Sequence, residues 1–191
     1  GSFPFTGGVF PFKRKDELPV RMFAGEGSSE RTNKRFHFLC TDQPFNRLST
    51  AFDSPSLYGR DPDERLDIFG KVCESGVSIS TVDEMDRLFE GFDLCDPNTS
   101  VSMTINGNYW WHLAAFFTVA IRQQIRIFES EIGRAPNEKE TAEIRAQTLS
   151  TVRGTVQADQ LKESMGQNTL VLNLDTACLL YTSDAADERL S

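Results

Sequence analysis

Long apolar runs are missing from this 191-residue sequence, and its N-terminus lacks an initiator Met and a signal-peptide core. Long basic tracts are missing too. Basic residues occur in short runs such as 13–15 and 31–35, without interleaved aromatics, and the formal net charge is −8. We therefore expect no membrane insertion and no nucleic-acid partner. We expect a cytoplasmic protein whose true start lies outside the sequence.

Metal-binding and disulfide patterns are equally sparse. The four cysteines are scattered along the chain without a close pair, and the two histidines, His37 and His112, are far apart. This spacing predicts no metal site and favours reduced cysteines that act as small buried apolar residues in a reducing compartment. His37 stands between two phenylalanines, which favours a packed side chain over a ligand.

What the sequence does contain is an ordinary globular composition, with 39% hydrophobic and 25% charged residues. Strand-like and helix-like segments alternate, which predicts an α/β fold with a parallel sheet. We expect four strands, near residues 21–24, 47–53, 101–106 and 154–157.

Three helices are expected between and after these strands. The clearest covers residues 111–131, and Gly133 ends it. A shorter helix covers 82–90, and a third follows Pro136 and continues to about residue 152. In the third helix Asn137 can act as the N-cap while Glu140 reaches back to it. On the long helix we expect one apolar face, which consists of Leu113, Phe116, Phe117, Ala120, Ile121, Gln124 and Phe128.

The strands carry small polar residues on one face. Ser102, Thr104 and Asn106 alternate with apolar residues in the third strand, and Ser49 and Asp53 do so in the second. A barrel interior is normally filled by bulky branched side chains. Small polar residues would instead leave a wettable tunnel for a long, thin, amide-bearing chain such as pantetheine. The alternative is an open sheet with one polar, solvent-facing side, although parallel sheets are normally covered on both faces.

Six motifs in order carry a family resemblance: RMFAGEG at 21–27, RLSTAFDS at 47–54, GFDL at 91–94, TSVSMTING at 99–107, RGTVQAD at 153–159 and GQNT at 166–169. Together they resemble the adenosylcobalamin-dependent acyl-CoA mutases of the methylmalonyl-CoA mutase superfamily, and among them the fused isobutyryl-CoA mutases. The resemblance covers residues 3 to about 174.

The resemblance implies a (β/α)8 TIM barrel that is threaded by the CoA tail. This chain would supply the N-terminal half, about four βα units, truncated before closure. Adenosylcobalamin would provide the radical chemistry and would be bound mainly by a domain absent from this chain. The implied partners are an acyl-CoA substrate, the cobalamin domain and a GTPase chaperone domain of the parent chain, and a second copy in a homodimer.

Two positions sort this family by substrate. Methylmalonyl-type relatives carry Tyr at the position of Phe23 and Arg at the position of Gln167, and that Arg grips a carboxylate. Because a neutral amide cannot do so, a buried carboxylate would lack its compensating charge. The pair therefore implies isobutyryl-CoA and n-butyryl-CoA as substrates. The 2-hydroxyisobutyryl-type relatives share the Gln but have a smaller aliphatic residue in place of the Phe.

Other site residues follow from the same comparison of motifs. Gln157 matches the family glutamine near the thioester and is the candidate catalytic residue. The remaining candidates for substrate contacts are Arg21, Ser49, Ser102, Thr104 and Phe10. At Phe10 relatives often have a Tyr, so one hydroxyl contact would be lost.

Two stretches depart from the family pattern. At residues 108–112 (NYWWH) the family has Pro-Ala-Pro and small aliphatics, which indicates either a reshaped tunnel mouth or an error in the underlying sequence. After about residue 174 the pattern ends. We expect 1–177 to be a partial mutase domain and 178–191 to be a non-native, adapter-derived tail.

Three interpretations of function stay open on these grounds. The first is a fragment of an isobutyryl-CoA mutase, itself inactive and active only within its parent. The others are a fragment of a related mutase for another acyl-CoA and a non-catalytic acyl-CoA-binding module.

Overall fold

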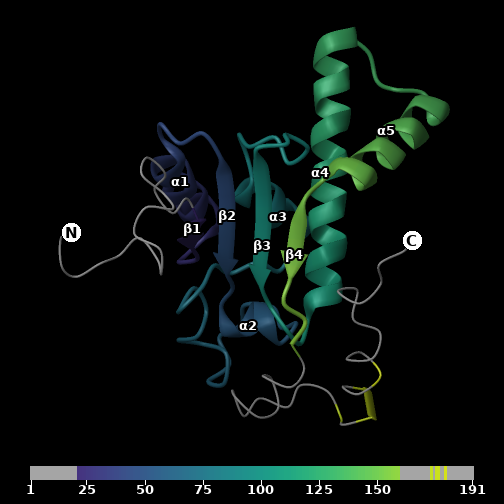
Figure 1. Cartoon of the computed structure of the whole chain (residues 1–191). Coiled ribbons are helices and arrows are strands. Elements are labelled where there is room, and N and C mark those ends of the chain that lie inside the picture. The colour runs from purple at the N-terminus through teal and green to yellow at the C-terminus, as the bar shows by residue number, and fades with distance from the viewer. Residues whose placement is uncertain (1–20, 160–172, 174, 177–178, 180–191) are drawn as a thin grey trace.

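Four parallel strands form the centre of the molecule, in the computed structural model that describes residues 21–159, 173, 175–176 and 179 (Figure 1). Their order in the sheet is the order in the chain, β1-β2-β3-β4, and every neighbouring pair is parallel. The bounds are β1 Arg21–Ala24, β2 Asn46–Ala51, β3 Thr99–Thr104 and β4 Gly154–Val156. All four predicted strands are confirmed, each within a few residues of its expected position.

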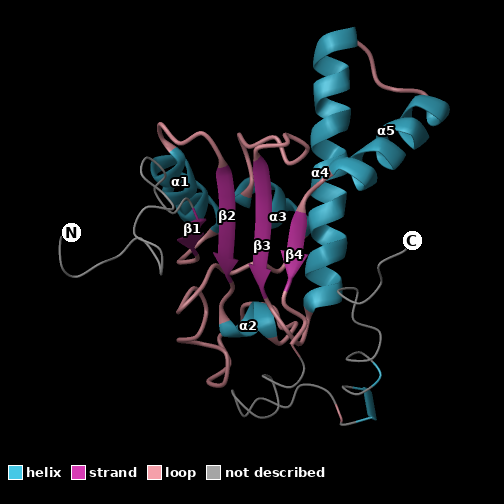
Figure 2. Ribbon diagram, viewed as in Figure 1, coloured by secondary structure: helices cyan, strands magenta, loops and turns pink. Residues whose placement is uncertain are grey.

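Five helices accompany the sheet within the described residues. Their bounds are α1 Ser29–Cys40, α2 Ser54–Leu57, α3 Val82–Leu88, α4 Tyr109–Ile132 and α5 Glu138–Thr151. Figure 2 shows α1, α3 and α4 together on one side of the sheet, while α5 leans against α4 and diverges from it. The parallel α/β architecture is therefore confirmed. A strand order without reversal and helices on one side are compatible with part of a barrel.

Local capping explains where several helices begin. At α5 the Asn137 side chain accepts from the Glu140 N–H at 2.9 Å, and the Glu140 carboxylate accepts from the Asn137 N–H at 2.8 Å. This is the predicted reciprocal cap. The sequence interpretation did not include α1, whose residues are mostly polar, although Ser28 caps it by accepting from the Arg31 N–H.

The hydrophobic core lies between the sheet and the helices. Leu48, Val101 and Met103 point from the strands toward the helical layer and are buried. From the helices, Phe36 and Phe116 fill the same layer. Within the strands, the apolar residues of the alternating pattern thus face the helices, and the residues between them face the opposite side of the sheet.

The buried stripe of α4 differs from the predicted one. The residues it buries are His112, Ala115, Phe116, Val119, Ala120 and Gln123. Of the predicted face only Phe116 and Ala120 are buried, whereas Gln124 and Phe128 line a hollow shared with α5. Because α4 packs against the sheet and α3 on one side and against α5 on another, its apolar surface is broader than one stripe.

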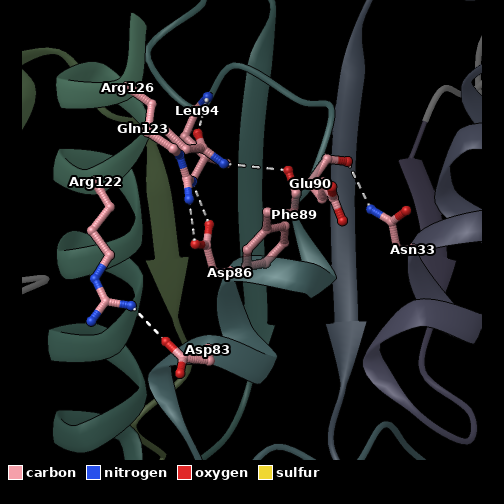
Figure 3. A network of polar contacts seen from close by, with 9 residues as sticks. All are labelled: Asn33, Asp83, Asp86, Phe89, Glu90, Leu94, Arg122, Gln123 and Arg126. Carbon is pink, nitrogen blue, oxygen red and sulfur yellow. Dashed lines mark hydrogen bonds and ion pairs between the residues drawn. The ribbon is translucent and has the colours of Figure 1, made fainter. Parts of the chain in front are cut away.

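Polar contacts join α3 to α4 on the outside of the molecule (Figure 3). Arg126 makes two hydrogen bonds of 2.7 Å with the Asp86 carboxylate, and these bonds raise the pKa of Arg126. The buried Gln123 amide donates to Phe89 O and accepts from Leu94 N–H, so it satisfies backbone groups just after α3. These contacts hold the helical layer that supports the sheet.

No helix among the described residues is long and apolar enough to cross a membrane.

Candidate functional site

One row of side chains crosses the whole sheet on the face opposite the helices. Phe23 of β1 pairs with Ser49 of β2, Ser49 pairs with Ser102 of β3, and Ser102 pairs with Thr155 of β4. Residues paired in this way point to the same side of a sheet. The Thr155 hydroxyl donates to Ser102 Oγ at 3.1 Å, which shows that these two side chains meet.

A second row lies one step nearer the carboxyl ends of the strands. Ala51 pairs with Thr104, and the Gln157 N–H donates to Met103 O at 3.3 Å, which places Gln157 beside Thr104. Gly25 follows β1 at this level, where a Cβ atom would lie 2.1 Å from Ala51 O. Only glycine allows this close approach of the backbones.

The two rows define a surface that we call the polar face: Phe23, Ser49, Ala51, Ser102, Thr104, Thr155 and Gln157. Its members differ in accessibility, since Phe23 is 58% exposed whereas Ser49 is 4% exposed. The sequence-predicted residues Phe23, Ser49, Ser102, Thr104 and Gln157 are therefore brought together on one surface by the strand register.

Beyond the carboxyl end of β2, Asp53 organises the chain. Its carboxylate accepts from the Ser56 N–H at 3.0 Å, from the Ser56 hydroxyl at 2.6 Å and from the Cys73 N–H at 2.8 Å. Asp53 is fully buried. These bonds cap the start of α2 and hold the loop that follows it. They also satisfy the hydrogen-bonding capacity of the buried carboxylate.

The loop at 58–81 returns to the sheet between the ends of β1 and β2. Val77 forms parallel bridges with both Gly27 and Phe52. At Gly76 a Cβ atom would lie 2.1 Å from the Phe52 carbonyl carbon, so only glycine fits there. This insertion separates the carboxyl ends of the two strands at the end of the polar face that carries Gln157.

The unusual stretch at 108–112 forms the start of α4. Asn108 is the N-cap residue but its side chain does not cap, and Trp110 is 58% exposed. His112 is fully buried. Its Nδ1 bonds to Asn108 O at 3.0 Å, while its Nε2 has no hydrogen-bond partner among the described residues. Burial lowers the pKa of His112 to about 4, so the ring is neutral at physiological pH.

The cysteines and His37 behave as separate structural residues. Cys40, Cys73 and Cys95 are free, and each is partly buried rather than buried as expected. Burial raises the pKa of all three thiols. His37 stacks on Phe92 at 4.2 Å between ring centroids. In the part of the chain that the structure describes, no group of three His, Cys, Asp or Glu side chains could hold a metal ion.

Three predicted site residues have no described side chain. Phe10 and Gln167 lie outside the described residues. Arg21 is placed only by its backbone, which pairs with Arg47 in the β1–β2 register. Most of the predicted tail, 178–191, also falls outside the described residues.

The strand register also identifies residues that sequence reasoning missed. Arg47 pairs with Ser100, and Arg153 stands just before the pair Val101–Gly154, so both arginines belong to a further row at the amino ends of the strands. In the sequence, each arginine stands two positions before a residue of the polar face, Ser49 or Thr155. This spacing becomes informative only once the strand register is known.

Comparison with known proteins agrees with this architecture. The family model described as methylmalonyl-CoA mutase matches residues 1–131. The chain is 60% identical over 177 residues to the fused isobutyryl-CoA mutase of Geobacillus kaustophilus. This alignment covers 93% of the chain and 16% of that protein. It is 60% identical over 175 residues to the fused isobutyryl-CoA mutase of Nocardia farcinica, at 92% and 16% coverage.

A more distant relative is the 2-hydroxyisobutanoyl-CoA mutase large subunit of Aquincola tertiaricarbonis, 36% identical over 172 residues. That alignment covers 90% of this chain and 26% of the relative. The chain thus spans about a sixth of the length of the two fused mutases that it matches. Its six ordered motifs, its parallel sheet and a family match over more than half of its residues show that the chain belongs to the methylmalonyl-CoA mutase family.

Proposed function

We propose that this chain is part of an adenosylcobalamin-dependent isobutyryl-CoA mutase, and that it forms the first four βα units of the enzyme's (β/α)8 barrel. The full-length protein that contains it, called the parent here, would interconvert isobutyryl-CoA and n-butyryl-CoA. The chain alone would be inactive, because half a barrel leaves two open sheet edges and an incomplete pocket.

The polar face is the observation that carries this proposal. Its hydroxyl groups, from Ser49 to Thr155, are aligned by the register across β2, β3 and β4, and Phe23 continues the row on β1. Hydroxyl groups that can both donate and accept suit the amide groups of a pantetheine arm. A barrel filled in the ordinary way would instead carry bulky branched residues here.

Phe23 has the properties of an acyl-group wall. It lies in the same row as Ser49 and Ser102, and it offers an exposed apolar ring without a hydroxyl. With the neutral Gln167 in place of an arginine, a substrate carboxylate would lose water without gaining a cation, at a free-energy cost of several kcal/mol. We therefore assign a butyryl-type acyl group to this position.

Gln157 is the residue that we place beside the substrate thioester. It stands at the carboxyl end of the polar face, next to Thr104, and its side chain is exposed. An amide N–H can donate to the thioester carbonyl and fix its orientation. Arg21, Ser49, Ser102, Thr104 and Phe10 are proposed as contacts along the rest of the acyl-CoA.

The described residues do not supply the cobalt ligand of a cobalamin. Of the two histidines, His37 bonds to Glu90 O and stacks on Phe92 among the outer helices, and His112 is buried beneath Trp111 and Phe52. We therefore assign cobalamin binding to another domain of the parent. Adenosylcobalamin, when bound there, supplies the radical for the rearrangement, while this chain binds and orients the thioester and excludes water.

The remaining proposals concern the parent. The two fused relatives are about six times longer than their aligned segment, which leaves room for further domains in the parent. From the family resemblance we infer that these are a cobalamin domain and a GTPase chaperone domain, and that the parent is a homodimer. The free, scattered cysteines favour a cytoplasmic location.

The deciding experiment is an assay of the purified parent with adenosylcobalamin on three substrates: isobutyryl-CoA, n-butyryl-CoA and methylmalonyl-CoA. We expect interconversion of the first two and little turnover of the third. Turnover of methylmalonyl-CoA without the butyryl pair would overturn the substrate assignment. Tight binding of acyl-CoA without any turnover would instead favour a non-catalytic binding module, and preference for a bulkier carboxylate-free acyl-CoA would favour a related mutase.

A further inference from the structure

We propose that Asp53 is a positioning residue for the acyl end of the substrate pocket. It holds residues 73–79, called the return segment here, as a wedge between the carboxyl ends of β1 and β2. The wedge in turn fixes the end of β1, the strand that carries Phe23. This inference rests on the proposed function and extends it to a buried side chain outside the polar face.

The return segment lies between the ends of the two strands and is bonded to both. On the β2 side, Val77 N–H donates to Ala51 O at 2.9 Å, and Asp53 N–H donates to Val77 O at 3.0 Å. On the β1 side, Ser78 N–H donates to Gly27 O at 3.1 Å. Val77 is a bridge partner of both chains, so at this level the return segment sets the spacing between them.

The backbone of the return segment does not favour this shape by itself. Cys73 and Ser75 have φ angles of 64° and 58°, in the left-handed region that non-glycine residues rarely adopt. Such a conformation persists only where the surrounding structure imposes it. The return segment therefore needs anchors from outside itself.

Asp53 and Ser56 supply these anchors, one at each end of the segment. Asp53 Oδ2 accepts from Cys73 N–H at 2.8 Å, and Ser56 Oγ accepts from Ile79 N–H at 2.8 Å. The Ser56 hydroxyl also donates to Asp53 Oδ1 at 2.6 Å, which joins the two anchors. Both side chains are buried, so water does not compete for these bonds.

The wedge acts at the reactive end of the polar face. Among the described residues β1 has only β2 as a neighbour in the sheet, so the pairing with β2 and the return segment hold it in place. A displaced wedge would shift the end of β1 and, with it, the Phe23 ring relative to Gln157. Because binding and reaction depend on placement to within about 1 Å, Asp53 should control how closely the pocket fits the acyl group.

Asp53→Asn separates this anchor from the cap of α2. The amide oxygen can still accept from Ser56, because Asn is as good an N-cap residue as Asp. The amide nitrogen then takes the place of Oδ2 and faces the Cys73 N–H, so two donors meet and the anchor is lost. Ser56→Ala removes the other anchor and serves where D53N does not fold.

The test measures two dissociation constants by calorimetry in the parent without adenosylcobalamin: for isobutyryl-CoA and for pivaloyl-CoA, which has one more methyl group. The wild-type parent should bind pivaloyl-CoA more weakly. In D53N and S56A the ratio of the two constants should fall by about threefold or more, because a looser pocket admits the extra methyl group. Loss of folded protein lowers the stoichiometry and leaves this ratio unchanged.

Asn137→Ala is the matched control. It removes the side chain that accepts from Glu140 N–H at the start of α5, so it also costs a helix cap. Because α5 is outside the polar face, the ratio of dissociation constants should stay at the wild-type value although stability decreases.

Hydrogen exchange keeps the inference separate from the proposed function. In D53N the amides of Gly27, Val77 and Ser78 should exchange about tenfold faster or more, because a lost bond to a carboxylate makes local opening easier. Unchanged exchange there, or an unchanged ratio of dissociation constants in folded D53N, would overturn the positioning role. Faster exchange and a changed ratio in a parent without mutase turnover would support that role and overturn only the proposed activity.

Discussion

The two faces of the sheet use the same strands for opposite purposes. Toward the helices, Leu48, Val101 and Met103 are buried in a continuous apolar core. Toward the other side, Ser49, Ser102 and Thr155 form polar rows in which Phe23 is the large apolar residue. The helix side holds the fold together, whereas the polar side is the one that we propose binds the substrate. Substitutions on the two sides should therefore affect different measurements.

The largest expected effect is on the helix side. Phe116 is buried against Phe89, and its ring reaches β4 at Gly154. Phe116→Ala should lower the free energy of unfolding by about 3–5 kcal/mol, through lost burial and a residual cavity. Chemical denaturation followed by tryptophan fluorescence measures this. Phe38→Ala, at an 80% exposed position of α1, is the control, with an expected change below about 0.5 kcal/mol.

His112 predicts a pH dependence that originates in the core. Its pKa is lowered from 6.5 to about 4 in the folded state, mainly by burial. Above pH 6.5 both folded and unfolded chains have a neutral ring, so His112 contributes no pH dependence there. As pH falls through 6.5, the imidazole becomes protonated in the unfolded chain but stays neutral in the folded chain. The free energy of unfolding therefore decreases until about pH 4. The total decrease is about 3 kcal/mol.

His112→Leu should remove this component of the pH dependence. The measurement is the free energy of unfolding between pH 7 and 4 for both proteins, with the difference plotted against pH. A difference that stays constant over this range would contradict the burial of a neutral imidazole.

On the polar face, substrate preference should change without loss of stability. Phe23→Tyr combined with Gln167→Arg should shift the ratio of kcat/KM from isobutyryl-CoA toward methylmalonyl-CoA by at least about tenfold, because a guanidinium can pair with the substrate carboxylate. Steady-state assays of the parent on both substrates measure the ratio. An unchanged ratio in a folded, cofactor-binding variant would count against the pocket assignment.

The smallest change in activity among these predictions is expected at Ser102. Its hydroxyl accepts from Thr155 at 3.1 Å on a partly exposed surface, so Ser102→Ala should change the free energy of unfolding by less than about 1 kcal/mol. KM for the acyl-CoA should rise a few-fold if the hydroxyl contacts the pantetheine arm. A large loss of stability would show that the polar face also supports the fold.

Much of the fold could be predicted because its signals are local. The reciprocal cap of Asn137 and Glu140 and the alternation in β3 each depend on residues a few positions apart. Other features could not be predicted in this way. The polar α1 carries little apolar signal, and the burial of His112 and Gln123 reflects packing of α4 against Phe52 and α3, tens of residues away in sequence.

By itself, the sequence determined the order of the four strands and of α3, α4 and α5, the family, and the residue types on each side of the strands. Caps and period-2 alternation are short-range, so they can be recognised without knowing which strands are neighbours. The tertiary structure decided which side chains share a row: Phe23 with Ser49 and Ser102, and Arg47 with Ser100. Those rows depend on the register between strands that are about 25 to 50 residues apart in sequence. Packing against the helices selects this register, because a shift of one residue would turn the apolar side chains away from the core.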